Sequence, residues 1–198
     1  GSAAWLSLDE TDNDLRRFLS HLLAAVAVVR PDAMREAQTL LQATQQVQVD
    51  RLLSVLINAL AEETEPLLLC LDDYHEISSM PVHHFLGQLL RFLPPGISLA
   101  LATRHEPPLA LGQLRARGEV AEIAWNELHF SQEEAVTFLL EVRRLALTQE
   151  QAEQLAAQTE GWPAGLQLVA AALERGVPPT AVLRDKAGAE TRLRDFLL

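Results

Sequence analysis

The sequence predicts an α/β protein in which a parallel sheet, covered by helices on both faces, is followed by a small all-helical domain. Short apolar runs alternate with segments of helical periodicity through the first two thirds of the chain, which is typical of a parallel sheet. No strand pattern follows Trp125, and the remaining segments have only helical periodicity. We therefore expect an α/β core over residues 1–127 and a helical domain over residues 128–198.

The first predicted strand is the run AAWLSLD at residues 3–9, and a helix follows it. Thr11 is the expected N-cap of this helix. Its apolar residues recur at helical spacing: Leu15, Phe18, Leu19, Leu22, Leu23 and Val26. Residues 31–48 contain a proline and a glutamine-rich stretch, so they form either a connection or a weak helix. A second apolar stripe predicts a helix over residues 49–60.

The next strand is the apolar run at residues 67–71, whose start is fixed by Pro66. An amphipathic helix over residues 82–93 ends at a Pro-Pro-Gly sequence, and the run ISLALATR at residues 97–104 predicts another strand. The segment GEVAEIAW at residues 118–125 predicts a further strand of more mixed composition.

Local signals in the last third predict three helices. Ser131 with Glu134, and Thr148 with Gln151, match the capping box that begins a helix. Pro163 suits the first turn of a third helix.

The composition limits the classes of function. The 198 residues carry a formal net charge of −11, and Lys186 is the only lysine. Such a surface is a poor partner for a phosphate backbone, so we expect no direct nucleic-acid contact by this segment. The single cysteine, Cys70, lies in an apolar run, which indicates a buried structural thiol and a reducing, cytoplasmic setting. No stretch predicts a membrane span or a signal peptide.

Two adjacent carboxylates, Asp72 and Asp73, follow the apolar run at residues 67–71, and Arg104 follows the next one. Ligands of open α/β sheets collect at the carboxyl ends of the strands, so these side chains could share one site. One carboxylate with waters and nucleotide phosphates suits Mg²⁺, and a second can orient or deprotonate an attacking water. The alternative is structural: the aspartates cap the following turn or pair with a surface arginine, and Arg104 forms a surface ion pair.

Two other chemistries fit the pattern less well. A phosphoryl-accepting receiver domain also has an acidic cluster, but it needs a cation on a later strand end, whereas Lys186 lies in the helical tail. A zinc site needs converging histidines or cysteines. His83 and His84 are neighbours that point in different directions, and no suitably spaced ligand joins His75.

Five blocks of the sequence, in order, resemble one family. They are AAWLSLDETDNDLRRFLSHLLAAV, LLLCLDDYHEI, LALATRHEPPLALGQLRARGEVAEI, LHFSQEEAVTFL and TEGWPAGLQLVAAAL. These blocks are similar to the ATP-binding, NACHT/NB-ARC-like module of the large LuxR-family, MalT-like transcriptional regulators, members of the STAND class of signal-transduction ATPases. The resemblance covers nearly the whole chain and implies a P-loop NTPase-type core followed by a helical lid domain.

The resemblance implies roles for five residues. Asp72 is similar to the Walker B aspartate that holds Mg²⁺ through water, and Asp73 to the acid that polarises the hydrolytic water. Arg104 is similar to the sensor arginine that reads the terminal phosphate. Gly161 and Pro163 match the GxP motif of the lid, whose proline packs on the adenine; an ordinary helix start is the alternative. The implied cofactors of the parent protein are ATP or ADP and Mg²⁺, and its DNA binding is expected from a C-terminal helix-turn-helix outside the chain.

One part of the family pattern is missing. The phosphate-binding loop combines glycines with a lysine and a hydroxyl residue, and no such motif occurs in this sequence. The family places it ahead of the strand at residues 3–9, so we expect a fragment without the first strand and P-loop, with little ATP binding of its own. We also expect a gap between the strands at residues 67–71 and 97–101, closed by self-association or by inward movement of the segment at residues 3–8.

Two functions from different classes remain. The first is part of the ATP-dependent signal-transduction switch of a bacterial LuxR/MalT-type transcriptional regulator, in which nucleotide binding and hydrolysis control self-association and transcription activation. The second is a non-catalytic protein-interaction module that binds no nucleotide. The acids, the arginine and the GxP match favour the first function, whereas the missing loop favours the second for the isolated chain.

Overall fold

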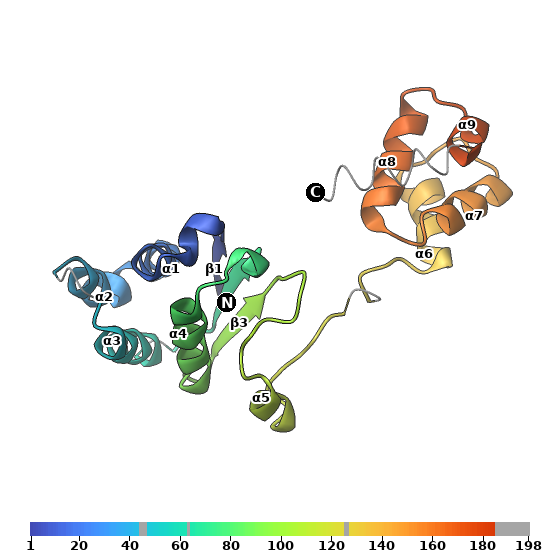
Figure 1. The fold of residues 1–198 in the computed structure, drawn as a ribbon. Coiled ribbons are helices and arrows are strands. Elements are labelled where there is room, and N and C mark those ends of the chain that lie inside the picture. Colours follow the sequence, from blue (N-terminus) through green and yellow to red (C-terminus); the bar gives the residue numbers. More distant parts are fainter. Residues whose placement is uncertain (44–46, 63, 125–126, 185–198) are drawn as a thin grey trace. The chain divides into compact units, whose positions relative to one another are not determined.

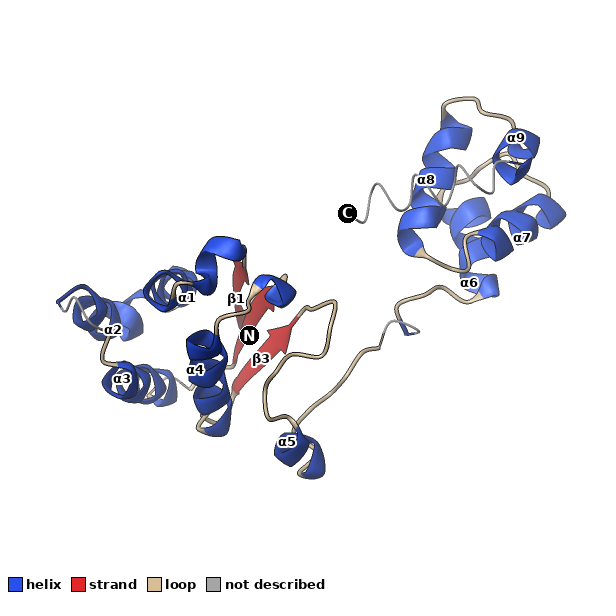
Figure 2. Ribbon diagram, in the orientation of Figure 1, coloured by secondary structure: helices blue, strands red, loops and turns tan. Residues whose placement is uncertain are grey.

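The computed structural model describes residues 1–43, 47–62, 64–124 and 127–184. The chain divides into two compact units, Gly1–Val120 and Ala121–Leu198. The first unit is α/β, and the described elements of the second are helical (Figure 1; Figure 2). None of the described helices has both the length and the apolar composition needed to cross a lipid bilayer.

Three parallel strands form the sheet, in the order β1-β2-β3. They are β1 (Ser2–Ser7), β2 (Leu67–Asp72) and β3 (Ile97–Leu101). Each strand coincides with one of the apolar runs that predicted it. The register places Ala4 beside Leu69 and Leu69 beside Leu99, so the carboxyl ends of all three strands meet at one edge of the sheet.

The expected gap between β2 and β3 does not exist. The two strands pair directly from Leu67 and Ile97 to Leu71 and Leu101, while β1 pairs with the opposite edge of β2. Inward movement of β1 is therefore wrong as a prediction, and no second copy is needed between these strands. The physical reason is that two parallel ladders already use the N–H and C=O groups on both edges of β2.

Four helices cover one face of the sheet, and a short fifth helix follows β3. They are α1 (Leu15–Val29), α2 (Pro31–Ala43), α3 (Val49–Ala61), α4 (Met80–Arg91) and α5 (Gly112–Ala116). Figure 1 shows α1 to α4 gathered on one side of the strands. There, Leu69 and Leu71 of the sheet are buried in one core with Phe18 and Phe85, whose rings meet edge to face. Residues 31–48, predicted as either a connection or a weak helix, are mainly the helix α2.

The opposite face of the sheet is not covered within the described part of the first unit, so the prediction of cover on both faces is wrong there. Side chains alternate across a strand, and those pointing away from α1 to α4 include Trp5, 62% exposed, and Leu68, 41% exposed. Ser98 and Ala100 are exposed on the same face. Cys70, whose register partners are Trp5 and Ala100, is the exception on this face: it is 8% exposed and free, in agreement with the predicted buried thiol.

The start of α1 differs from the prediction. A 3₁₀ turn at Glu10–Asn13, capped by Asp9, precedes the helix. The N-cap of α1 is therefore Asp14, whose carboxylate accepts the amide of Arg17 at 2.8 Å. Thr11 lies inside the extra turn, so its prediction as the cap is wrong.

The strand predicted at residues 118–125 is also wrong for the part that the structure describes. Residues 118–124 form no strand, and Trp125 lies outside the described residues. Ile123 is 73% exposed, and the amide of Glu119 donates back to the carbonyl of Leu114 at the end of α5. A short apolar run that carries two glutamates and meets no neighbouring strand has nothing to stabilise an extended ladder.

The second unit is built from α6 (Gln132–Thr137), a π-helical turn (Phe138–Val142), α7 (Gln149–Gln158), α8 (Pro163–Glu174) and α9 (Pro179–Arg184). Both predicted capping boxes are present, one pairing Ser131 with Glu134 and the other Thr148 with Gln151. Leu139, Leu155 and Leu166 are fully buried in a separate apolar core.

Candidate functional site

The two predicted acids lie where β2 ends. Asp72 is half-buried, and its Oδ1 accepts the amide of Asp73 at 3.0 Å. Asp73 is exposed and has left-handed backbone angles, φ 54° and ψ 37°. Aspartate adopts this conformation more readily than most residues. The chain therefore turns sharply at the acid pair and leads into the 3₁₀ turn at Tyr74–Glu76.

Backbone hydrogen bonds connect this turn to both neighbouring strand ends. The amide of Leu8 donates to the carbonyl of Asp72 at 3.0 Å, and the amide of Tyr74 donates to the carbonyl of Ala102 at 2.9 Å. Arg104 lies two residues beyond Ala102, with an exposed side chain. The structure thus places Asp72, Asp73 and Arg104 at the same edge of the sheet, as the strand pattern predicted.

A buried polar pair lies directly behind the acids. The hydroxyl of Tyr74 is 2.7 Å from Nδ1 of His83, and the two rings meet edge to face. Burial lowers the pKa of His83 and raises the pKa of Tyr74 well above its ordinary value. Both groups are therefore neutral at neutral pH, and one hydrogen bond joins the phenol to Nδ1. Sequence reasoning missed this pair because its members are nine residues apart and belong to different elements.

His75, two residues after Asp73, lies beside both exposed acids of the turn. Nδ1 of His75 is 3.9 Å from Oδ1 of Asp73, and Nε2 is 3.4 Å from Oε1 of Glu76. Among the described residues, no three His, Cys, Asp or Glu side chains gather in a way that could hold a metal ion. Zinc, which needs such a set, has no support here. Mg²⁺ differs, because it commonly takes one or two protein carboxylates together with waters and phosphates.

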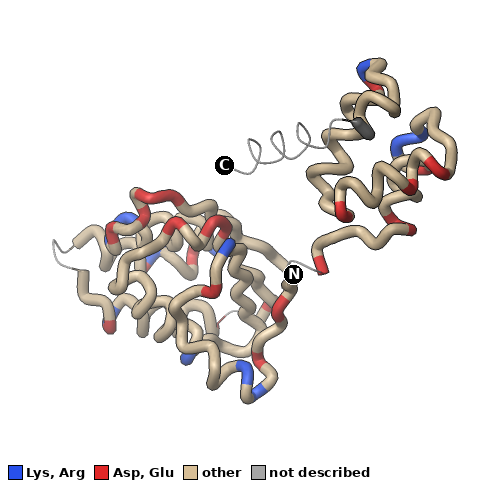
Figure 3. Tube along the Cα trace, turned by 45° about the vertical axis from the view of Figure 1, so that its right-hand side comes forward, with Lys and Arg blue, Asp and Glu red and all other residues tan. Residues whose placement is uncertain are grey.

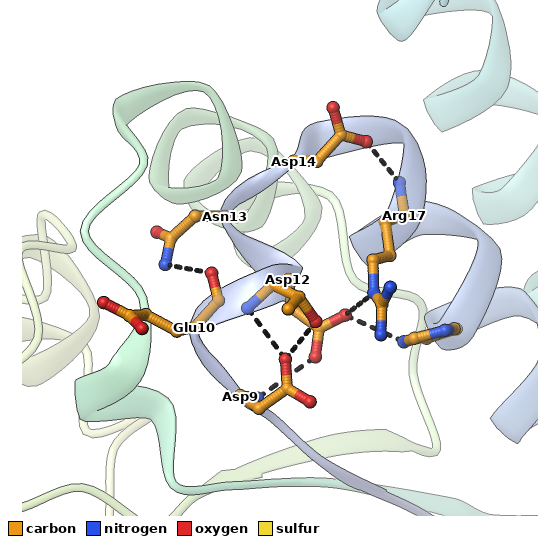
Figure 4. A network of polar contacts seen from close by, with 8 residues as sticks. Asp9, Glu10, Asp12, Asn13, Asp14 and Arg17 are labelled. Atoms are coloured by element: carbon orange, nitrogen blue, oxygen red, sulfur yellow. Dashed lines mark hydrogen bonds and ion pairs between the residues drawn. The ribbon is translucent and has the colours of Figure 1, made fainter.

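A second polar network lies at the end of β1 (Figure 4). Asp12 is 1% exposed; its Oδ2 accepts the amide of Asp9 at 3.1 Å, and its Oδ1 is 2.8 Å from Nδ1 of His21. Hydrogen bonds from Thr11 hold the pKa of Asp9 below its ordinary value. Asn13, at the end of the same turn, contacts the segment after β2. The signal for this network was the acid-rich run ETDND immediately after a strand.

Acidic residues are spread along the chain of both units (Figure 3). The edge of the sheet carries Asp9, Asp12, Asp72 and Asp73, with Arg17 and Arg104 as cations. A negative edge of this kind attracts a divalent cation, and it repels a phosphate unless a cation or a metal lies between them.

Gly161 and Pro163 belong to the second unit, where the geometry explains both residues structurally. Gly161 has φ +75°, and a Cβ added to it would lie 2.1 Å from the carbonyl oxygen of Phe130. The amide of Phe130 also donates to the carbonyl of Gly161 at 2.8 Å. Pro163 is the first residue of α8, and the ring of Trp162 lies tilted against that of His129, with 4.5 Å between ring centroids.

Comparison with known proteins identifies the relatives of this chain. It is 34% identical over 167 residues to the HTH-type transcriptional regulator MalT of Serratia proteamaculans. It is 32% identical over 166 residues to the regulators of the same name from Yersinia enterocolitica and Yersinia pestis. This chain is a MalT-like segment.

The matched region covers 84% of the MalT-like segment but only 18% of the length of each of these relatives. The similarity therefore concerns one part of a much longer regulator. No protein-family model matches the chain.

Proposed function

We propose that the MalT-like segment is part of the ATP-dependent signal-transduction switch of a bacterial transcriptional regulator. In the whole protein, the state of the nucleotide would set self-association and transcription activation. The observation that carries the proposal is the pair of adjacent carboxylates at the end of the central strand, with Arg104 at the same edge of the sheet.

Each acid has a distinct position that suits a distinct role. Asp72 is fixed at the last position of β2 and would hold Mg²⁺ through water with the oxygen that does not accept the amide of Asp73. Asp73 points from a left-handed turn into solvent and would orient or deprotonate a water molecule. Bound Mg²⁺ would supply charge neutralisation for the nucleotide phosphates.

Arg104 and the GxP residues are proposed as further nucleotide contacts, each within its own unit. The exposed guanidinium of Arg104, carried on the segment after β3, is able to bind a terminal phosphate bidentately. Pro163 at the start of α8 would pack on the adenine, and the turn at Gly161 would fix its approach. The 198 residues contain no glycine-rich loop with a lysine, so we propose that the phosphate cradle lies outside the segment and that the segment alone binds ATP weakly.

The test compares single substitutions in the full-length protein that contains this segment. Asp73→Asn keeps the size of the side chain but removes the base, so we expect hydrolysis to slow by about 10²-fold or more while ATP binding is retained. Asp72→Asn should instead weaken the Mg²⁺-dependent part of ATP binding. Both are measured as single-turnover hydrolysis and as nucleotide affinity with and without Mg²⁺.

The control is Asp50→Asn, a substitution of the same type at an exposed position of α3. It should leave hydrolysis and affinity unchanged. Wild-type hydrolysis rates in Asp73→Asn would remove Asp73 from the mechanism, and an unchanged Mg²⁺ dependence in Asp72→Asn would remove Asp72 from the metal site.

A second candidate function is a protein-interaction module that binds no nucleotide, and the uncovered face of the sheet favours it. Trp5 and Leu68 expose apolar surface there, as interaction sites commonly do. Under this alternative, Mg²⁺ with ATP changes neither the self-association of the full-length protein nor its activation of transcription. Trp5→Ser, by contrast, changes the mass of the segment's complexes in light scattering. The two functions are therefore separable by experiment.

A further inference from the structure

The side chain of Asn13 bridges two turns that are far apart in the sequence. It lies at the end of the 3₁₀ turn after β1, and Figure 4 shows its amide directed away from Asp12 and Arg17. Its Nδ2 donates to the carbonyl of Glu76 at 2.9 Å, across 63 positions of sequence. The bridge therefore joins the segment after β1 to the segment that follows the acid pair.

The oxygen of the same amide accepts from the start of α4. Oδ1 of Asn13 lies 2.7 Å from the amide nitrogen of Ser78 and 2.8 Å from that of Ser79, and the Ser78 hydroxyl is 3.2 Å away. Ser79 is the N-cap residue of α4 and caps nothing with its own side chain. Asn13 thus satisfies amides at a helix start that the local sequence leaves open.

Only an asparagine of this orientation satisfies every partner. Nδ2 faces two carbonyls, those of Glu76 and of Glu10 at 3.0 Å, while Oδ1 faces N–H donors. An aspartate would place an oxygen against the two carbonyls and lose both donated bonds. Position 13 therefore requires a side chain with both a donor and an acceptor, which size and polarity alone do not provide.

The turn that Asn13 grips is the one that carries the acids. Between Asp73 and Ser79 the chain is held by the Tyr74–His83 bond on its buried side and by Asn13 on its outer side. At the other end, Asp72 is fixed within β2. Without Asn13, the turn would keep the Tyr74–His83 bond and the bond from the Tyr74 amide to Ala102, but its outer side, from Glu76 to Ser79, would lose its hydrogen bonds to the segment after β1.

We infer that Asn13 is a positioning residue, which holds the turn at Asp73–Ser79 so that Asp72 and Asp73 face a common Mg²⁺ site. The inference rests on the proposed function, because it assigns Asn13 to the same site. It adds that the turn after β1, which carries none of the predicted ligands, sets the geometry of the acids after β2.

The test uses Asn13→Ala and Asn13→Asp in the 198-residue chain, with Asn58→Asp as a matched control. Asn58 is exposed on α3 and belongs to the same unit. The first readout is amide hydrogen exchange, which needs no ligand. The second is the affinity for Mn²⁺ alone, followed by paramagnetic broadening of amide signals at Asp72 and Asp73, with Asp72→Asn as the reference for loss of the site.

We expect Asn13→Ala, which removes the acceptor, to accelerate exchange of the Ser78 and Ser79 amides by about tenfold or more, with the strands unaffected. Asn13→Asp keeps an acceptor oxygen but loses both donated bonds, so its effect on exchange should be smaller. Mn²⁺ affinity should fall by about tenfold, as is common when a group that orients a metal ligand is lost. The defect of Asn13→Asp relative to wild type should persist from about pH 7.5 to about pH 5 and shrink only as the pH falls towards about 4, where the carboxyl becomes protonated and can donate again to one carbonyl. Asn58→Asp should show none of these changes.

The failure of the inference and the failure of the proposed function give different results. Unchanged exchange of the Ser78 and Ser79 amides in both variants shows that Asn13 does not hold the turn. Faster exchange with wild-type Mn²⁺ affinity shows that the hydrogen bonds of Asn13 do not position the acids, and it leaves the proposed function intact. Absence of any localised Mn²⁺ binding in the wild-type chain overturns the positioning role, whereas the proposed function fails separately if Asp73→Asn hydrolyses ATP at the wild-type rate in the full-length protein.

Discussion

Gly161 offers a quantitative test of the geometry at the start of α8, because it combines two constraints that can be separated. Its φ of +75° lies in the left-handed region, and a Cβ would meet the carbonyl oxygen of Phe130 at 2.1 Å. Gly176, after α8, has φ +88°, but no atom lies within 4 Å of the position that its Cβ would occupy. Gly161→Ala therefore suffers both strain and collision, whereas Gly176→Ala suffers strain alone.

The expected magnitudes follow from these contacts. The left-handed conformation costs a non-glycine residue about 1 kcal/mol, and this applies to both variants. Relief of the collision at Gly161 requires the backbone of Phe130 to move, which breaks its 2.8 Å hydrogen bond to Gly161, a loss of about 1 kcal/mol. It also disturbs the tilted ring contact between His129 and Trp162, worth about 1 kcal/mol. We expect a destabilisation of about 3 kcal/mol for Gly161→Ala and about 1 kcal/mol for Gly176→Ala.

The assay is urea unfolding followed by the fluorescence of Trp162, in a background where Trp5 and Trp125 are replaced by phenylalanine. This probe reports the second unit only. A Gly161→Ala variant whose free energy of unfolding lies within about 0.5 kcal/mol of that of Gly176→Ala would refute the reasoning, since the collision would then cost nothing.

Three further outcomes are expected. Burial lowers the pKa of His83, so below about pH 6.5 the unfolded chain binds a proton that the folded chain does not. The free energy of unfolding should therefore be constant above about pH 6.5 and fall below it. His83→Gln should remove most of this fall, as measured by urea unfolding at a series of pH values. Ser131→Ala should destabilise the second unit by about 1 kcal/mol through loss of the α6 cap, measured by the same fluorescence, and an unchanged midpoint would contradict the role of the cap. Asp73 has φ 54°, which glycine adopts without strain and a β-branched residue does not. Asp73→Gly should therefore raise the midpoint of thermal unfolding slightly, whereas Asp73→Val should lower it. The reverse order would argue against the left-handed turn.

Much of the secondary structure and the location of the acids could be predicted from the sequence, because those signals are local. The run that ends in Asp72 and Asp73 is a strand by its apolar content, and parallel strands bring their carboxyl ends, with Arg104, to one edge. The capping box of Ser131 with Glu134 forms within one helical turn, so a window of four residues contains all of its hydrogen bonds.

Which strands, turns and side chains contact one another was decided by the tertiary structure alone. The direct pairing of β2 with β3, the exposure of Trp5 on an uncovered face and the failure of residues 118–124 to form a strand all depend on which segments are neighbours in space. Likewise, Asn13 contacts Ser79 across 66 positions of sequence, and Gly161 lies against the backbone of Phe130. Periodicity reports which face of an element is apolar and capping reports where it begins, but neither contains the identity of a distant partner, which is fixed only when the chain packs.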